Sequence, residues 1–98
     1  ETPIEAASRE LKEEIGYGAN KLTFLKTITL APGYQSNTTH IVLAEDLYEE
    51  VAEGDEPEPL EIVTHKLSNL EKLTYDEDLT EARSILALYM VREIIRNR

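Results

Sequence analysis

Three glutamates stand close together in the segment Arg9-Glu10-Leu11-Lys12-Glu13-Glu14-Ile15-Gly16. Glu10 lies four residues before Glu14 and three before Glu13, so a helix would hold all three carboxylates within a wedge of about 100°. Like charges at this spacing repel one another. The helix dipole also disfavours Glu13 and Glu14, because they lie near the C-terminus of the expected helix. A hard divalent cation with oxygen ligands would offset the repulsion. The spacing therefore indicates a metal site, with an acidic face in solvent as the alternative.

The residues around the glutamates predict the helix that must position them. Thr2 and Glu5 are spaced as a capping box with Pro3 at the first helical position, and Gly16 supplies a left-handed stop. The apolar residues three or four apart that mark the buried stripe are Ile4, Ala7, Leu11 and Ile15. The acidic wedge borders this stripe instead of opposing it, which favours the metal site over the solvated face.

The string from Glu1 to Tyr17 resembles the last seventeen positions of the Nudix box, Gly-x5-Glu-x7-Arg-Glu-U-x-Glu-Glu-x-Gly-U, where U is a bulky apolar residue. The opening Gly and the five residues after it would precede Glu1. We therefore expect residues 1–98 to be the C-terminal portion of a single Nudix hydrolase domain, with the remainder of the box at 1–17. The resemblance implies an α+β fold, a Nudix-type α/β/α sandwich whose mixed sheet lacks upstream strands.

Composition excludes several other classes of protein. The net charge of −10 at pH 7 argues against a nucleic-acid polymer as partner, because phosphate backbones are bound by basic patches. The chain has no cysteine, which fits a reducing cytoplasm and gives no disulfide framework. No apolar run approaches the length of a membrane span. His40 and His65 are far apart and lack cysteine partners, so neither is predicted as a transition-metal ligand.

The rest of the chain predicts strands at 21–30, 40–44 and 62–66 from β-branched and apolar residues. A turn at 31–34 and a polar loop follow the first strand. An acidic stretch at 45–61 contains two prolines and a glycine that exclude regular structure over part of it. We expect the mixed sheet to use these strands.

Two helices are predicted nearer the C-terminus. Ser68 and Glu71 are spaced as a second capping box, opening a short helix that runs to about Leu73. Asp78 with Glu81 is predicted to cap a terminal helix. The apolar residues of its inner face are Ile85, Leu88, Tyr89 and Ile95.

Beyond the box, several segments resemble the ADP-compounds hydrolases among the Nudix enzymes. They are Ala31-Pro32-Gly33-Tyr34, Asp46-Leu47-Tyr48, Gly54-Asp55-Glu56-Pro57-Glu58-Pro59-Leu60 and Glu81-Ala82-Arg83. Pro32 is similar to a proline that helps to mark enzymes of the ADP-ribose type and is a candidate substrate contact. The resemblance implies a Mg²⁺-dependent pyrophosphatase, with Mn²⁺ as a substitute, that converts ADP-ribose, NADH or diadenosine polyphosphates to AMP and a phosphorylated product. It also implies a cytoplasmic homodimer.

The resemblance assigns roles to the box residues. Glu10 and Glu14 would bind the metal directly, and Glu13 directly or through water. Arg9 would pair with a carboxylate, with Glu1 as the usual partner in the family. Bound Mg²⁺ neutralises charge on phosphoryl oxygens and activates water for in-line attack.

The general base remains open between two positions. In related ADP-ribose hydrolases it lies on an acidic loop after the sheet, the region of Glu56 and Glu58 here, and Glu10 is the alternative. Tyr34 is a candidate for stacking on adenine, with packing as the alternative. Arg83 is a candidate phosphate contact, with pairing to an acidic neighbour as the alternative.

Two other interpretations drop catalysis. A non-catalytic nucleotide-binding Nudix module is disfavoured by the intact set of Arg9, Glu10, Glu13 and Glu14. An acidic divalent-cation-binding interaction domain is disfavoured because no EF-hand loop pattern occurs in the chain.

Overall fold

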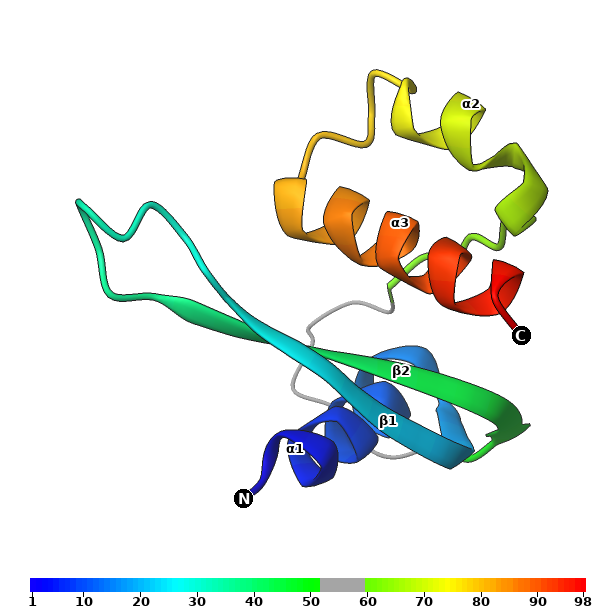
Figure 1. Cartoon of the computed structure of the whole chain (residues 1–98). Helices are drawn as coiled ribbons and strands as arrows, with labels where there is room; N and C mark the ends of the chain where they lie inside the picture. Colours follow the sequence, from blue (N-terminus) through cyan, green and yellow to red (C-terminus); the bar gives the residue numbers. More distant parts are fainter. Residues whose placement is uncertain (52–59) are drawn as a thin grey trace. The chain divides into compact units, whose positions relative to one another are not determined.

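The computed structural model describes residues 1–51 and 60–98. The chain divides into two compact units, Glu1–Ile62 and Val63–Arg98 (Figure 1). The first unit combines a helix with a two-stranded antiparallel ribbon, and the second is helical. The single domain expected over 1–98 stays a prediction. No helix in the two described ranges has the length and apolar character needed to cross a membrane.

The first unit opens with α1 (Pro3–Glu10), which starts as the sequence predicts. The backbone N–H of Glu5 donates to Oγ1 of Thr2 at 3.1 Å, and the N–H of Thr2 donates to Oε1 of Glu5 at 3.3 Å. The capping box is therefore confirmed, and Pro3 occupies the first turn, where a missing N–H costs nothing.

The helix widens after Glu10 into one π turn, η1 (Leu11–Ile15). The sequence interpretation assumed α-helical geometry as far as Gly16 and was wrong over these five residues. The left-handed stop itself is confirmed, because Gly16 has φ 81° and its N–H donates to the carbonyl of Leu11 at 3.1 Å. Single π turns of this kind are frequent at functional sites.

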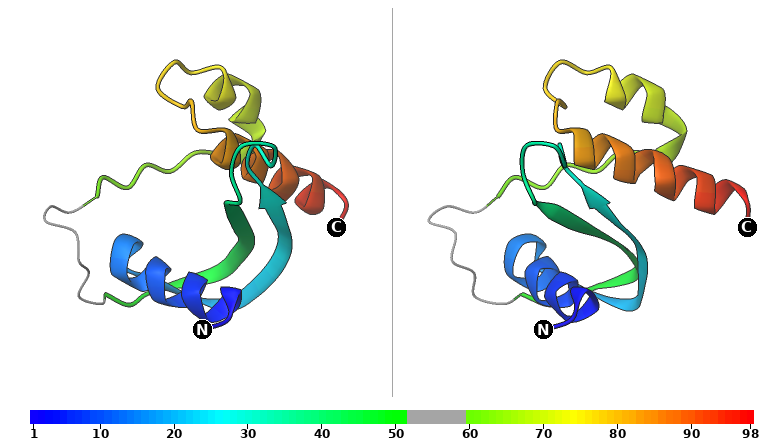
Figure 2. Two further views of the ribbon diagram at one scale, coloured as in Figure 1. Left: turned by 90° about the vertical axis from the view of Figure 1, so that its left-hand side faces the viewer. Right: turned by 60° about the vertical axis from the view of Figure 1, so that its left-hand side comes forward.

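The ribbon pairs β1 (Tyr17–Thr29) with β2 (Thr38–Glu49). Both predicted strands are confirmed in type, but β1 begins four residues earlier than predicted and β2 extends five residues further, into the acidic stretch. The two additions pair with each other, Tyr17 opposite Glu49, so the backbone ladder compensates for the low strand propensity of acidic residues. Helix α1 contacts both strands. The turn that connects β1 to β2 lies at the end of the ribbon away from α1 (Figures 1 and 2).

A β-bulge interrupts the ribbon. Phe24 pairs with Val42 and Lys26 pairs with Ile41, so Leu25 is the additional residue on β1. Among the described residues of this unit, Ile41 is the buried apolar residue, at 7% exposure.

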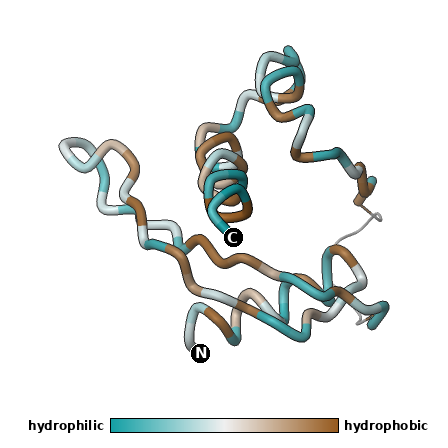
Figure 3. The backbone as a smooth tube through the Cα atoms, turned by 45° about the vertical axis from the view of Figure 1, so that its right-hand side comes forward, coloured by the Kyte–Doolittle hydropathy of each residue, from teal (hydrophilic) through white to brown (hydrophobic). Residues whose placement is uncertain are grey.

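The second unit contains a 3₁₀ turn, η2 (Leu67–Asn69), followed directly by α2 (Leu70–Thr74), and then α3 (Ala82–Arg96). Leu70 is only 1% exposed and is the most deeply buried side chain described. The hydroxyls of Thr74 and Tyr89 lie 3.0 Å apart and join α2 to α3. Apolar and polar residues alternate around α3, as expected for a helix with one packed face (Figure 3).

Three predictions for this part of the chain are wrong. Residues 62–66 form no strand, because a strand needs a hydrogen-bonded neighbour and none of the described segments pairs with them. Ser68 is not a helix cap, since the 3₁₀ turn occupies its position. Helix α3 is capped by Glu81 itself and not by Asp78, whose N–H donates to Asp76 instead.

The predicted inner face of α3 is mostly right. Ile85, Leu88 and Tyr89 are partly buried, whereas Ile95 is 41% exposed. Helices and an antiparallel ribbon in one chain confirm the α+β class.

Candidate functional site

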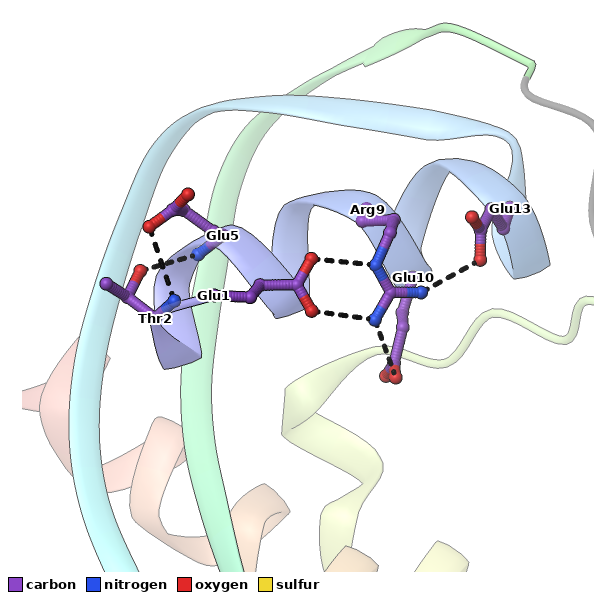
Figure 4. A network of polar contacts seen from close by, with 6 residues as sticks. All are labelled: Glu1, Thr2, Glu5, Arg9, Glu10 and Glu13. Atoms are coloured by element: carbon purple, nitrogen blue, oxygen red, sulfur yellow. Dashed lines mark hydrogen bonds and ion pairs between the residues drawn. The ribbon is translucent and has the colours of Figure 1, made fainter.

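Arg9 is the centre of a network of carboxylates that come from α1, from η1 and from Glu1, which precedes α1 (Figure 4). Its Nε donates to Oε2 of Glu1 at 2.8 Å and its Nη2 to Oε1 of Glu1 at 3.0 Å, a two-pronged pairing. Its Nη1 donates to Oε2 of Glu13 at 3.2 Å, and Oε1 of Glu10 lies 3.7 Å from Nη2. The predicted pairing of Arg9 with Glu1 is therefore confirmed.

The pairing changes the acidity of both partners. The hydrogen bond from Arg9 lowers the pKa of the Glu1 carboxyl. The same bond, with the charges of Glu1, Glu13 and Glu10, raises the pKa of the Arg9 guanidinium. Because both side chains are exposed to solvent, the Arg9–Glu1 pair contributes little to the free energy of unfolding. Its main effect is to fix the orientation of the two side chains.

Glu10 and Glu14 point to a different place from Glu13. They line one hollow of about 240 Å³, whose other lining residues are Ala7, Leu11, Ile15, Leu22, Val42 and Ala44. Glu13 does not line this hollow, and its carboxylate is turned to Arg9. Glu10 and Glu14 therefore share a hollow, whereas Glu13 is hydrogen-bonded to Arg9 outside it, and Glu10 also lies within ion-pair distance of Arg9.

The donor chemistry of the pair fits a hard divalent cation. Carboxylate oxygens are the ligands that Mg²⁺ and Ca²⁺ prefer, and Leu22, Val42 and Ala44 supply apolar side chains to the lining of the same hollow. Within residues 1–51 and 60–98, no group of three acidic or histidine side chains is close enough to hold an ion. Two carboxylates, those of Glu10 and Glu14, share a hollow, and the metal roles of Glu10, Glu13 and Glu14 stay predictions.

A contact that the sequence interpretation missed joins the end of η1 to Glu50, the residue directly after β2. The N–H of Glu50 donates to the carbonyl of Gly16 at 2.9 Å, and Nζ of Lys12 lies 3.5 Å from Oε2 of Glu50. The opposite charges at Lys12 and Glu50 were visible in the sequence, but their proximity depends on the length of β2. These two contacts hold the carboxylate-bearing turn against the ribbon.

The candidate substrate contacts at the ribbon turn lie apart from the carboxylates. Pro32 and Tyr34 belong to the turn that connects β1 and β2, at the end of the ribbon away from α1 (Figure 2). The side chain of Tyr34 is 96% exposed, so packing does not account for it within the described residues. Stacking on a base therefore stays open as a prediction.

The remaining predicted site residues lie elsewhere in the chain. Arg83 belongs to the second unit, and its Nε donates to Oε1 of Glu81 at 3.0 Å, so the pairing with an acidic neighbour is confirmed. Glu56 and Glu58 fall outside the described residues, and their candidacy as general base stays a prediction.

His40 is the second feature that the sequence interpretation missed. It lines a hollow of about 330 Å³ together with Glu10, and the other lining residues are Pro3, Ala6, Ala7 and Val42. His40, Val42 and Ala44 alternate along β2 and so lie on one face, which was the only sequence signal for this placement.

Comparison with known proteins agrees with this geometry. The family model described as NUDIX domain matches residues 1–89. The chain is 52% identical over 98 residues to the ADP compounds hydrolase NudE of Escherichia coli (strain K12), covering all of this chain and 53% of that protein. It is 37% identical over 90 residues to the ADP-ribose pyrophosphatase of Bacillus subtilis (strain 168), covering 90% of this chain and 49% of that protein. The chain thus spans about half the length of the curated relatives it matches.

A solved structure gives the same result. The crystal structure of an ADP compounds hydrolase superposes with a TM-score of 0.93 at 52% sequence identity, over 99% of this chain and 52% of that one. The fold of the described residues and the matched family model lead to one assignment: this chain belongs to the Nudix family.

Proposed function

We propose that this chain carries the metal-binding turn of a Mg²⁺-dependent Nudix hydrolase, which cleaves the diphosphate bond of ADP-linked compounds to release AMP. The observation that supports it most is the shared hollow of Glu10 and Glu14 beside the network of Arg9. Nudix hydrolases generally use divalent cations, and two curated relatives are named for ADP compounds and ADP-ribose. Substrates of the proposed enzyme are ADP-ribose, NADH and diadenosine polyphosphates.

The residues of the candidate site would have different roles in the proposed reaction. Glu10 and Glu14 would hold the cation, which supplies charge neutralisation at the phosphoryl oxygens and activation of water. Glu13 would complete the site directly or through water, while Arg9 limits the directions in which its carboxylate can point. Mn²⁺ would replace Mg²⁺, since both accept oxygen ligands.

The general base of the proposed reaction is Glu10, Glu56 or Glu58. Glu10 has the advantage that it lines two hollows beside α1, so it can meet both a cation and a water molecule. A base must come within hydrogen-bond distance of the water that it deprotonates. Substitution of each glutamate by glutamine, followed by the pH dependence of kcat, separates the three candidates.

An assay of AMP release tests the proposal. The protein is incubated with ADP-ribose, NADH and diadenosine triphosphate, with Mg²⁺ or with a chelator, and AMP is quantified. Because the chain spans about half of its curated relatives, a second form joins it to the part of the Escherichia coli relative that it does not match. We expect metal-dependent AMP release, stronger in the joined form, and a loss of about 100-fold or more in Glu14→Gln.

The control for Glu14→Gln is Glu77→Gln, which removes one charge at an exposed position of the second unit. Metal-dependent nucleotide binding without AMP release would favour a non-catalytic binding module. Metal binding without nucleotide binding would favour a cation-binding interaction domain. Equal AMP release by Glu14→Gln and the parent would refute the assignment of the site.

The proposal includes a cytoplasmic homodimer. The absence of cysteine is compatible with a reducing compartment. Sedimentation of the protein measures the oligomeric state, and cell fractionation measures its location.

A further inference from the structure

His40 lies on the side of the ribbon that faces the carboxylate-bearing helix. It shares a face of β2 with Val42 and Ala44, and both His40 and Val42 line the hollow of about 330 Å³ that Pro3, Ala6 and Ala7 of α1 close on the other side. Glu10 is the one acidic side chain in the lining of this hollow. An imidazole and a carboxylate thus face the same space.

The β-bulge on β1 determines what stands opposite His40. Tyr17 pairs with Glu49 before the bulge, and this register would place Lys26 opposite His40. The additional residue, Leu25, shifts the register so that Thr27 stands there. Bulges are enriched next to functional sites, where they redirect a side chain.

The shift gives the imidazole a fixed orientation. Oγ1 of Thr27 lies 2.8 Å from Nδ1 of His40, and the ring of Phe24 lies at 6.1 Å and 54° from the imidazole ring. With Nδ1 engaged by the hydroxyl, Nε2 is the ring nitrogen left for a ligand. A Lys26 side chain in place of Thr27 would instead set an ammonium group beside the ring, which cannot accept a hydrogen bond from the imidazole.

Glu10 connects this hollow with the one that it shares with Glu14. A pyrophosphate held by a cation at Glu10 and Glu14 would therefore extend past Glu10 toward His40. We propose that His40 is a substrate-contacting residue, whose Nε2–H donates to a phosphoryl oxygen of the ADP-linked substrate while the Thr27 hydroxyl donates to Nδ1. This inference rests on the proposed function and adds a specificity-determining contact to it.

Nuclear magnetic resonance of the imidazole rings tests the contact without turnover. The chain has two histidines, and His65 belongs to the second unit, so its ring is an internal control. The probe is α,β-methylene-ADP with Mg²⁺, in which the bridging oxygen is replaced and hydrolysis is blocked. We expect the His40 signals to shift saturably and the His65 signals to stay in place, with assignments from His40→Gln and His65→Gln. Calorimetric binding of the probe with no change at His40 would overturn the inference.

Kinetics in the AMP assay provide the second measurement. We expect His40→Ala to raise KM about tenfold with little change in kcat, as for a lost hydrogen bond to a charged acceptor. His40→Gln should recover part of the loss because its amide can still donate. Thr27→Val should raise KM by a smaller factor, and Thr29→Val on the same strand is its matched control.

The outcomes separate the inference from the proposed function. Metal-dependent AMP release by the parent with an unchanged KM in His40→Ala would refute the contact alone. A parent that neither binds the probe nor releases AMP would refute the function and the contact together. A fall in kcat and thermal stability with an unchanged KM would show that His40 has only a structural role.

Discussion

Arg9 holds two carboxylates with one guanidinium, Glu1 through two hydrogen bonds and Glu13 through a third. Only a planar group with several fixed N–H donors can make this arrangement, so an ammonium cannot replace it. Without it, Glu13 would lose its partner and its carboxylate would repel that of Glu10. The residue therefore acts on the candidate metal site through its neighbours.

The first prediction concerns this arginine. Arg9→Lys keeps the charge but loses the fork, and we expect the Mg²⁺ concentration for half-maximal AMP release to rise by about 10–100-fold, as for other groups that orient metal ligands. Arg96→Lys, at an exposed arginine that pairs with Glu93 on α3, is the control. An unchanged Mg²⁺ dependence in Arg9→Lys, with the helix content intact by circular dichroism, would contradict this role.

At the scale of single residues, the sequence predicted which side chains pair better than it predicted which hollow each side chain faces. The resemblance to the Nudix box implied the pairing of Arg9 with Glu1, and the structure confirms it. Glu13 follows Arg9 by four residues, so their pairing could also be expected from helical spacing, and the structure confirms it. The hollow that Glu10 shares with His40 was not predictable, because it depends on how β2 packs against α1, which the pattern of apolar and polar residues does not reveal.

Gly18 shows how the elements of the first unit constrain one another. It pairs with Tyr48 across the ribbon, and a Cβ at Gly18 would lie 2.4 Å from Cζ of that ring. The ring therefore covers the glycine, and even a methyl group would displace it. This contact ties the start of β1, directly after the carboxylate-bearing turn, to the end of β2.

The second prediction tests that contact with a double-mutant cycle. Gly18→Ala should lower the free energy of unfolding by about 1 kcal/mol, since overpacking forces the ring aside. In a Tyr48→Ala background the same change should cost little, because the clash is gone. Denaturant unfolding of the four proteins measures the coupling. Equal costs of Gly18→Ala in both backgrounds would show that the ring does not cover the glycine.

The third prediction concerns the start of α3. Glu81 accepts hydrogen bonds from the backbone N–H groups of Arg83 and Ser84. The bond from Arg83 is the main cause that lowers the pKa of the Glu81 carboxyl below its usual 4.5. Because the pKa of Glu81 is lowered in the folded state, the ionised cap makes its full contribution to the stability of the folded state above pH 4.5. This contribution is lost as the pH falls through the lowered pKa.

The thermal midpoint of the chain, measured between pH 7 and 3, checks the sign. The parent should lose more stability on acidification than Glu81→Gln, so the difference between them should shrink below about pH 4.5. Glu77→Gln, a matched loss of one charge outside the cap, should not show this convergence. A difference between parent and Glu81→Gln that is constant with pH would contradict the cap.

Element type was predicted more reliably than element boundaries or caps. The strand pair was recognisable from β-branched residues, but the extension of β2 through Glu45–Glu49 was not, because acidic residues disfavour strands unless a ladder partner is present. The failed strand at 62–66 is the converse case. Its residues have strand propensity but no hydrogen-bonded neighbour among the described segments.

Among the residues that the structure describes, the most buried side chain belongs to one unit and the candidate site to the other. Leu70 is 1% exposed in the second unit, whereas the carboxylates, Arg9 and His40 belong to the first. Stability need not be uniform across such a chain, because compact units open separately when each has its own packing. A change at Leu70 therefore distinguishes local from global unfolding.

The last prediction uses that difference. Leu70→Ala should cost about 2–5 kcal/mol, the usual range for a fully buried leucine, and should lower amide protection in α2 and α3 first. Leu86→Ala, at a position 41% exposed on α3, should cost under about 1 kcal/mol and serves as the control. Hydrogen exchange followed by mass spectrometry assigns the loss to segments. If amides of β1 and β2 lose protection in step with those of α3, the two units unfold as one cooperative structure, which would support the single domain that the sequence predicts.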